Sequence, residues 1–188
     1  MVEGNQPWAA WPTYNLQQLD TAINNARQAG KYLFIWDKQG SVGTFMTYKG
    51  QLAAIGPEII KMALNRQTNA DVGEFIRKHF VHGMRQGENL CFDCDTTTPD
   101  WASYAVDGTF VPDQFFNYEF MNQERNYMPY VREEENHGIG GLNPGHGYCR
   151  ADTFSMMIRT GVETEEELNA IIAKIPLFNE QFHHVVIQ

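Results

Sequence analysis

A continuous apolar run from Tyr32 to Trp36 constrains this chain more than any other feature of its sequence. Every position in the run is a large apolar residue, and the run ends at Asp37. Because successive side chains of a strand point to opposite faces, a strand that is apolar at every position must be covered on both faces. Sheets covered in this way are mostly parallel, with helices on either side. The run therefore predicts a central strand of an α/β fold.

Helix and strand patterns alternate along the rest of the chain. Asn15 and Gln18 form a capping-box pattern before a helix that Gly30 ends, and Thr164 to Glu167 forms another such pattern. Further strands are expected at residues 90–95, 151–159 and 183–187. We therefore expect a three-layer α/β fold, with a mainly parallel sheet of about four or five strands and helices on both faces.

Residues 1–188 are expected to form a single α/β domain. Within it, residues 101–150 comprise an inserted lobe and the Gly-rich loop that follows the lobe. The lobe is dense in aromatic residues, and Trp and Tyr are enriched at protein interfaces. Two interpretations are open, because aromatic residues at helical spacing also serve a domain's own core. On the first interpretation, a protein partner contacts Trp101, Tyr104, Phe110, Phe115, Phe116 and Tyr127.

The segment after Asp37 has the composition of a phosphate-binding loop. It contains small and hydroxyl residues and leads to Lys49, and ligands of open α/β sheets bind beyond the carboxyl ends of strands. The candidate cofactor-binding residues are Asp37, Gly40, Ser41, Gly43, Thr44, Lys49, Asp93 and Asp95.

In these residues, positions 31–95 resemble the core of P-loop NTPases. The resemblance implies a bound Mg-nucleotide, with the acid that ends the strand from Leu90 orienting magnesium. The sequence departs from the family pattern, because Gly40 and Gly43 are only three apart and Lys49 is followed by Gly50. This departure predicts a degenerate loop.

Three cysteines, an odd number, indicate a reducing compartment, and we expect a cytoplasmic protein. Cys91-x-x-Cys94 and His146-x-x-Cys149 could together supply zinc ligands. Residues three apart on a strand point to opposite faces, however, so we expect Cys91 and Cys94 to be buried thiols that bind no metal. His137 and His146 flank the Gly-rich loop and are candidate general bases, although no catalytic residue is assigned.

A formal charge of −9 and the absence of any basic cluster argue against nucleic acid as a partner. No apolar run is long enough to span a bilayer, and residues 1–15 do not resemble a signal peptide, so no membrane association is expected.

The sequence thus supports two hypotheses of function. The first is a non-enzymatic protein-interaction module without a cofactor, built on a degenerate nucleotide-binding scaffold. The second is a nucleotide-binding NTPase or switch that uses residues 40–49 together with Asp93 or Asp95 and magnesium.

Overall fold

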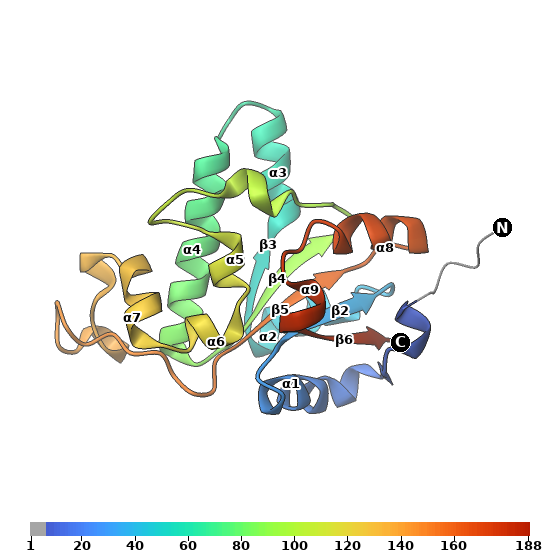
Figure 1. The fold of residues 1–188 in the computed structure, drawn as a ribbon, viewed down its shortest axis with the longest axis horizontal. Coiled ribbons are helices and arrows are strands. Elements are labelled where there is room, and N and C mark those ends of the chain that lie inside the picture. The colour runs from blue at the N-terminus through green and yellow to red at the C-terminus, as the bar shows by residue number, and fades with distance from the viewer. Residues whose placement is uncertain (1–6) are drawn as a thin grey trace.

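The protein folds around one six-stranded sheet in which every strand pair is parallel. A computed structural model describes residues 7–188; the first six residues, part of the segment expected to lack a signal peptide, lie outside this range. The strand order is β1-β6-β2-β5-β4-β3 (Figure 1). The α/β class and the parallel sheet are confirmed, and the sheet has more strands than expected because two short strands were missed.

The strands are β1 (Thr13–Tyr14), β2 (Tyr32–Asp37), β3 (Gln51–Ala54), β4 (Asn89–Asp95), β5 (Ser155–Thr160) and β6 (Phe182–Ile187). The longer helices are α1 (Leu19–Gln28), α2 (Ser41–Lys49), α3 (Ile55–Ala63), α4 (Asn69–Gln86) and α8 (Glu165–Ile172). Shorter helices are α5 (Pro112–Phe115), α6 (Tyr118–Met121), α7 (Glu124–Tyr127) and α9 (Phe178–Gln181). Single 3-10 turns occur at Pro7–Ala10, Leu16–Gln18, Trp101–Tyr104, Met128–Tyr130, Glu133–Glu135 and Ile139–Gly141.

Two cores, one on each face of the sheet, account for the apolar run in β2. Tyr32, Phe34 and Trp36 point into the larger core, and Leu33 and Ile35 point into the smaller one. All of them are buried, as the run predicts. The smaller core lies under α1 and α2, and the larger core lies under the remaining helices.

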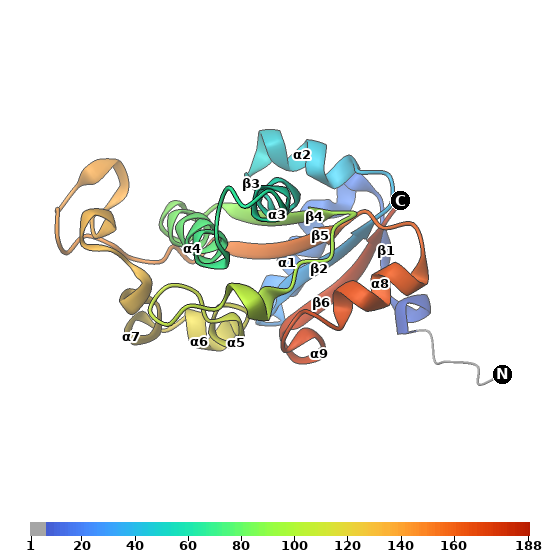
Figure 2. The same ribbon diagram turned by 90° about the horizontal axis from the view of Figure 1, so that it is seen from above.

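The winding of the chain explains why the helices divide between the faces in this way. The chain crosses the sheet in one direction from β1 to β2 and then to β3, and it returns through β4 and β5 to β6. Because parallel crossovers are right-handed, a reversal of direction moves the connecting helices to the other face. Figure 2 shows α8 and α9 on the side of the sheet opposite α2.

The aromatic insertion between β4 and β5 is part of the larger core, which corrects the expectation of an exposed aromatic surface. All six residues proposed as partner contacts are buried: Trp101, Tyr104, Phe110, Phe115, Phe116 and Tyr127. These side chains contact one another and the sheet. For example, the ring centroid of Trp101 lies 5.1 Å from that of Phe116 in the insertion and 6.1 Å from that of Phe92 in β4. These rings complete the core, because the sheet face beneath them would otherwise be uncovered.

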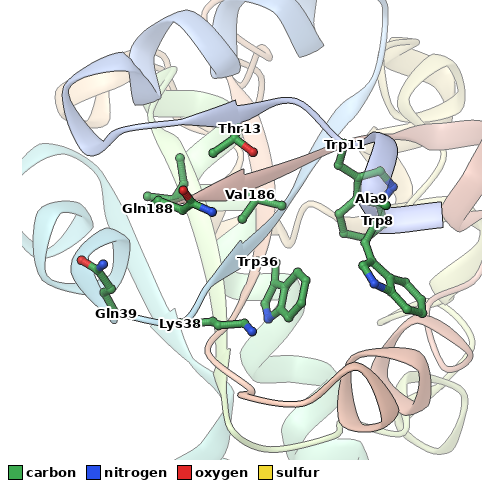
Figure 3. Close-up of a pocket in the computed structure, with 10 residues that line it drawn as sticks. Trp8, Ala9, Trp11, Thr13, Trp36, Lys38, Gln39, Val186 and Gln188 are labelled. Carbon is green, nitrogen blue, oxygen red and sulfur yellow. The ribbon is translucent and has the colours of Figure 1, made fainter. Parts of the chain in front are cut away.

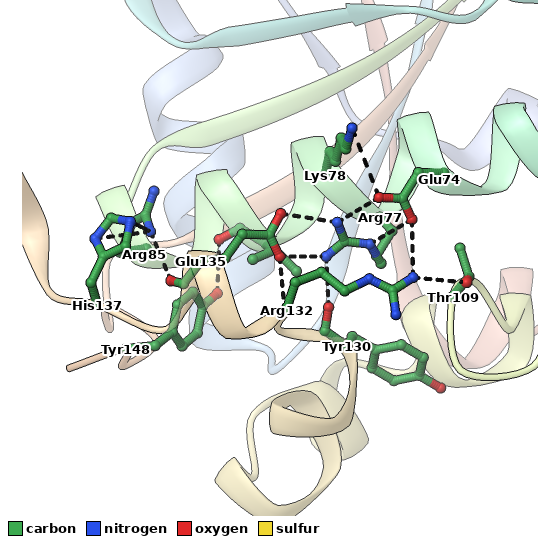
Figure 4. Close-up of polar contacts among 11 residues, drawn as sticks. Glu74, Arg77, Lys78, Arg85, Thr109, Tyr130, Arg132, Glu135, His137 and Tyr148 are labelled. Atoms are coloured by element: carbon green, nitrogen blue, oxygen red, sulfur yellow. Dashed lines mark hydrogen bonds and ion pairs between the residues drawn. The ribbon is translucent and has the colours of Figure 1, made fainter. Parts of the chain in front are cut away.

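A network of charged side chains anchors the insertion to α4 (Figure 4). Arg77 of α4 is fully buried and makes a double hydrogen bond to Glu74, with Nε–Oε2 at 2.8 Å and Nη2–Oε1 at 2.7 Å. Arg77 also binds both carboxylate oxygens of Glu135, at 2.6 and 2.9 Å, and the main-chain oxygen of Tyr130 at 2.7 Å. Arg132 adds a further contact to Glu74 at 3.3 Å. The acidic turn at residues 133–135 is therefore a structural anchor.

The structure confirms the predicted starts of two helical segments but differs from the prediction after Asp37. The capping boxes at Asn15 and Thr164 are present. The prediction of a loop after Asp37 is wrong, because residues 41–49 form α2 and, after Gly50, residues 51–54 form β3. The strand expected from residue 151 begins only at Ser155. Among residues 7–188, no helix combines the length and apolar character needed to cross a membrane.

Candidate functional site

Four charged side chains meet at the carboxyl edge of the sheet, and we call them the Arg159 cluster. Arg159 on β5 is buried, and its Nε donates to Oδ2 of Asp37 at 3.3 Å. Its Nη1 donates to Oδ1 of Asp93 at 2.9 Å and to Oδ1 of Asp95 at 3.1 Å. Nη2 donates to the main-chain oxygen of Asp37 at 2.9 Å. The cluster therefore joins the ends of three strands.

The alternation of side chains along the strands brings this cluster together. Asp37, Asp93 and Arg159 each lie two residues beyond a member of the smaller core, so their side chains point to the same face. Asp93 is the partner of Arg159 in the β4–β5 register. Gly161 makes room for the guanidinium, because a Cβ at this position would lie 2.6 Å from Nη2 of Arg159.

The first turn of α2 is bound by the carboxylate of Asp37. Oδ2 of Asp37 accepts from the main-chain N–H of Val42 at 2.8 Å, and Oδ1 accepts from the Ser41 hydroxyl at 3.3 Å. The chain enters the helix through Gly40, whose φ of 72° is in the left-handed region that favours glycine. A carboxylate of the chain itself thus occupies part of the helix terminus that a phosphate would use.

The predicted cofactor residues separate into two groups. Asp37, Gly40 and Ser41 lie at the carboxyl edge with Asp93 and Asp95, whereas Lys49 is at the far end of α2, where the chain turns into β3. Gly43 and Thr44 lie within the helix; Gly43 allows α2 to approach β4, because a Cβ there would lie 3.1 Å from Oδ2 of Asp93. The structure therefore does not bring Lys49 together with the two acids of β4.

The electrostatics of the Arg159 cluster favour internal pairing. Burial alone lowers the pKa of Arg159, but the hydrogen bond and charge of Asp93, together with the charge of Asp37, raise that pKa above its usual value. Three carboxylates face one guanidinium, so the cluster carries excess negative charge, which repels phosphate groups. Within residues 7–188, no three His, Cys, Asp or Glu side chains are arranged to hold a metal ion.

An open pocket lies at the same edge of the sheet, where β2 and β6 end (Figure 3). We call it the tryptophan pocket. Its volume is about 370 Å³, and three indole rings contribute to its wall. Its lining comprises Trp8, Ala9, Trp11, Thr13, Trp36, Lys38, Gln39, Val186, Ile187 and Gln188.

The three tryptophans of the pocket differ in how firmly they are fixed. Trp36 is 6% exposed and its Nε1 donates to the main-chain oxygen of Val162 at 2.8 Å. Trp11 is half-buried and packs against Phe34 and His184, with ring centroids 5.8 and 5.1 Å apart. Trp8 is half-buried, and its Nε1 is buried without a hydrogen-bond partner in the part of the chain that the structure describes. Trp36 and Trp11 are therefore the rigid part of the wall, and Trp8 is the ring whose buried donor is not satisfied by the described chain.

One cation belongs to this wall. Lys38 follows Asp37 in the turn to α2, and its Nζ lies 4.3 Å from the centroid of the Trp36 ring. This cation–π contact places an ammonium group beside an apolar surface. The pocket thus combines aromatic rings, an ammonium group and the amides of Gln39 and Gln188.

The cysteine and histidine candidates do not form a common site. Cys91 and Cys94 are buried in different cores, as expected, and burial raises the pKa of both thiols. Cys149 is exposed. His137 lies against Arg85, with Nε2 and Nη1 3.1 Å apart, and His146 is exposed on the Gly-rich loop.

Sequence reasoning missed Arg159 and the three pocket tryptophans. Arg159 ends a run of apolar residues, and a charged residue in a buried strand needs a partner of opposite charge, which was a usable signal. Trp8 and Trp11 gave no such signal, because only the tertiary fold brings the segment before β1 to the edge of the sheet where β2 and β6 end. Neither a protein-family model, a curated protein nor a solved structure matches this chain.

Proposed function

We propose that this chain is a protein-interaction module whose binding site is the tryptophan pocket. The observation that carries the proposal is an open pocket of about 370 Å³ with three indole rings at the carboxyl edge of a parallel sheet. Ligands of open α/β sheets bind at this edge, and pockets that are largely apolar with a few polar groups are the usual binding sites.

The chemistry of the wall favours a segment of another protein as the ligand. Trp is enriched at interfaces, because it supplies a large rigid surface with one polar group. The Nε1 of Trp8 is buried without a partner among residues 7–188, and we expect it to pair with a carbonyl oxygen of a bound main chain once the ring turns outward. Lys38 offers a positive charge next to the rings. The expected ligand is therefore an extended segment that carries an apolar ring and, beside it, a carboxylate.

The Arg159 cluster supports a binding role over catalysis at this edge. All three nitrogens of its guanidinium donate to the chain's own oxygens. A group engaged in this way stabilises the strand ends, and the cost of breaking a buried ion pair opposes its use on a substrate.

The test is a selection of peptides from a random display library on the wild-type protein, followed by measurement of Kd for the strongest peptide. We expect Trp8→Ala to raise the Kd of this peptide by roughly 30-fold. This change corresponds to about 2 kcal/mol of binding free energy, as for a central interface residue. Lys38→Gln should raise the Kd by a smaller factor, and it should reduce the dependence of Kd on salt concentration.

The matched control is Tyr48→Ala, because Tyr48 is 83% exposed and lies near the far end of α2. This variant should bind the peptide like the wild type. Peptides that bind Trp8→Ala as tightly as the wild type would contradict the proposal, and so would a library that yields no binder.

The same protein tests the nucleotide hypothesis directly. If Mg-ATP or Mg-GTP at a hundred times its Kd raises the stability of the wild type, the gain is about 2.7 kcal/mol. Loss of that gain in Asp93→Asn, with its retention in Trp8→Ala, would favour nucleotide binding at the strand ends over the present proposal.

A further inference from the structure

Arg150, in the segment before β5, has no ionic partner among residues 7–188. Within this described range, its hydrogen bonds join its main-chain N–H to the Tyr127 hydroxyl and its Nη1 to the main-chain oxygen of Ala151 at 3.4 Å. Its Nε and Nη2 are buried and have no hydrogen-bond partner in the described part of the chain. The guanidinium is therefore charged, half-buried and largely unsatisfied.

The two unpartnered nitrogens of Arg150 form one edge of the guanidinium. Arg77 shows what that edge does elsewhere in this chain, because its Nε and Nη2 bind both oxygens of Glu74 at 2.8 and 2.7 Å. The planar fork of arginine matches a carboxylate in this geometry. Arg150 thus presents, unoccupied by any described group, the same pair of donors that Arg77 uses.

The surroundings of Arg150 hold the guanidinium in place. Its Cζ lies 5.4 Å from the centroid of the Phe154 ring and 5.8 Å from that of Tyr118. Tyr118 in turn contacts Tyr32, with ring centroids 5.3 Å apart. The hydroxyl of Tyr32 is also buried without a partner. Two rings therefore support the cation, and a second free donor is close to it.

The energetics favour an added anion. Burial raises the pKa of Tyr32 and the charge of Arg150 lowers it, which shows that the two groups interact electrostatically. A buried donor without a partner is destabilising, and more so when it is charged. Arg150 is partly exposed but its Nε and Nη2 are buried, so a small anion from solvent reaches these two donors only after the side chain shifts, without unfolding of the chain.

We propose that the free Nε–Nη2 edge of Arg150 is a binding site for a carboxylate. A carboxylate has two coplanar oxygens that match this edge, and it brings a single negative charge. Phosphate brings up to two charges to a chain whose net charge is already −9. The site lies at the amino end of the sheet, so it is distinct from the tryptophan pocket and does not depend on the proposed function.

The experiment follows the Nε–H resonances of arginine by NMR while sodium acetate is added to the whole chain. We expect the Arg150 resonance to shift and saturate with acetate, and to stay unchanged with sodium chloride at equal ionic strength. The Arg77 resonance is the internal control, because Glu74 already occupies its edge. An Arg150 resonance that does not move, or that moves equally with chloride, overturns the proposal.

Two variants separate a fork from a simple positive charge, with backbone amide shifts around Ala151 as the readout. Arg150→Lys keeps the charge but loses the paired donors, so its affinity for acetate should fall at least about tenfold. Arg125→Lys is the matched control, because Arg125 is exposed and hydrogen-bonds to the side chain of Gln123. The affinity of this variant for acetate should stay within about twofold of the wild type. If Arg150→Lys binds acetate as tightly as the wild type does, the proposal is overturned.

Inorganic phosphate distinguishes the two anions at this site. If phosphate saturates the Arg150 shift at a lower concentration than acetate does, the assignment to carboxylates is overturned. If acetate saturates it at a lower concentration, the assignment stands.

Discussion

The aromatic insertion and the tryptophan pocket are both rich in large rings, yet the insertion buries its rings and the pocket exposes them in part. Trp101, Phe115 and Phe116 of the insertion are fully buried. Trp8 and Trp11 of the pocket remain half-buried. The insertion helps to cover the face of the sheet that α1 and α2 leave open (Figure 2). The pocket lies at the edge of the sheet where β2 and β6 end.

This difference shows that the position of a ring in the fold decides its role, and that the local density of rings does not. A ring above the middle of a sheet is covered by neighbouring elements, because leaving that area in water is costly. At the carboxyl edge, Trp8 and Trp11 are only half covered by their neighbours, although Trp36 at the same edge is buried. The two regions should therefore respond differently to the same kind of substitution.

The largest effect is expected for Phe116→Ala in the insertion. Phe116 contacts Trp101, Phe110 and Phe182, at 5.1, 6.0 and 5.9 Å between ring centroids. Removing a buried Phe leaves a cavity, so the free energy of unfolding should fall by about 3–5 kcal/mol. Urea unfolding measures this change. A loss below about 1 kcal/mol would mean that the insertion is not part of the core and would break the comparison.

A smaller effect is expected for Glu135→Gln, which weakens the anchor between the insertion and α4 (Figure 4). The substitution removes the negative charge that faces the buried Arg77 and leaves Glu74 as its remaining carboxylate partner. The free energy of unfolding should fall by about 1–3 kcal/mol, as for a buried group that loses a charged partner. Glu134→Gln is the matched control, because Glu134 is an exposed neighbour in the same turn, and it should leave the unfolding midpoint unchanged.

Acid should weaken the same anchor. Burial raises the pKa of Glu135, but the hydrogen bond and charge of Arg77 outweigh it and hold that pKa below its usual value; a hydrogen bond to Arg77 also lowers the pKa of Glu74. A depressed carboxylate pKa contributes stability that is complete above the unfolded value of about 4.3 and is lost as the pH falls. The urea midpoint should therefore decrease below about pH 5, and less steeply in Glu135→Gln than in the wild type. Equal slopes would exclude Glu135 from the effect.

Much of the fold could be predicted from the sequence, because its main signals are local. The apolar run of β2 reports burial on both faces, and the capping boxes at Asn15 and Thr164 report where helical segments begin. The segment at residues 41–54 was missed because its glycine and hydroxyl residues resemble a loop. In the fold, α2 is stabilised by the packing of Val42 and Met46 against the sheet, and tertiary packing can override weak local propensity.

The candidate sites were harder to predict, because their members come from distant parts of the chain. Asp37 and Asp93 were identified as acids at strand ends, but the guanidinium of Arg159, which binds both, lies 122 residues beyond Asp37. Trp8 meets the end of β2 only after β1 has paired with β6. Spacing in the sequence carries no record of such encounters.

The smallest effect on stability, and the sharpest contrast with Phe116→Ala, is expected for Trp8→Ala. Trp8 packs only partly against the larger core, and its Nε1 donates to no group in the described chain. Replacing it should therefore lower the free energy of unfolding by about 1 kcal/mol or less, since partly exposed side chains contribute little to folding. Urea unfolding of both variants under one set of conditions makes the comparison. If Trp8→Ala proves as destabilising as Phe116→Ala, then Trp8 serves the core, and the difference between the two aromatic regions would disappear. If Trp8→Ala lowers the free energy of unfolding only slightly, the ring contributes little to stability, as expected of a side chain that contacts a partner.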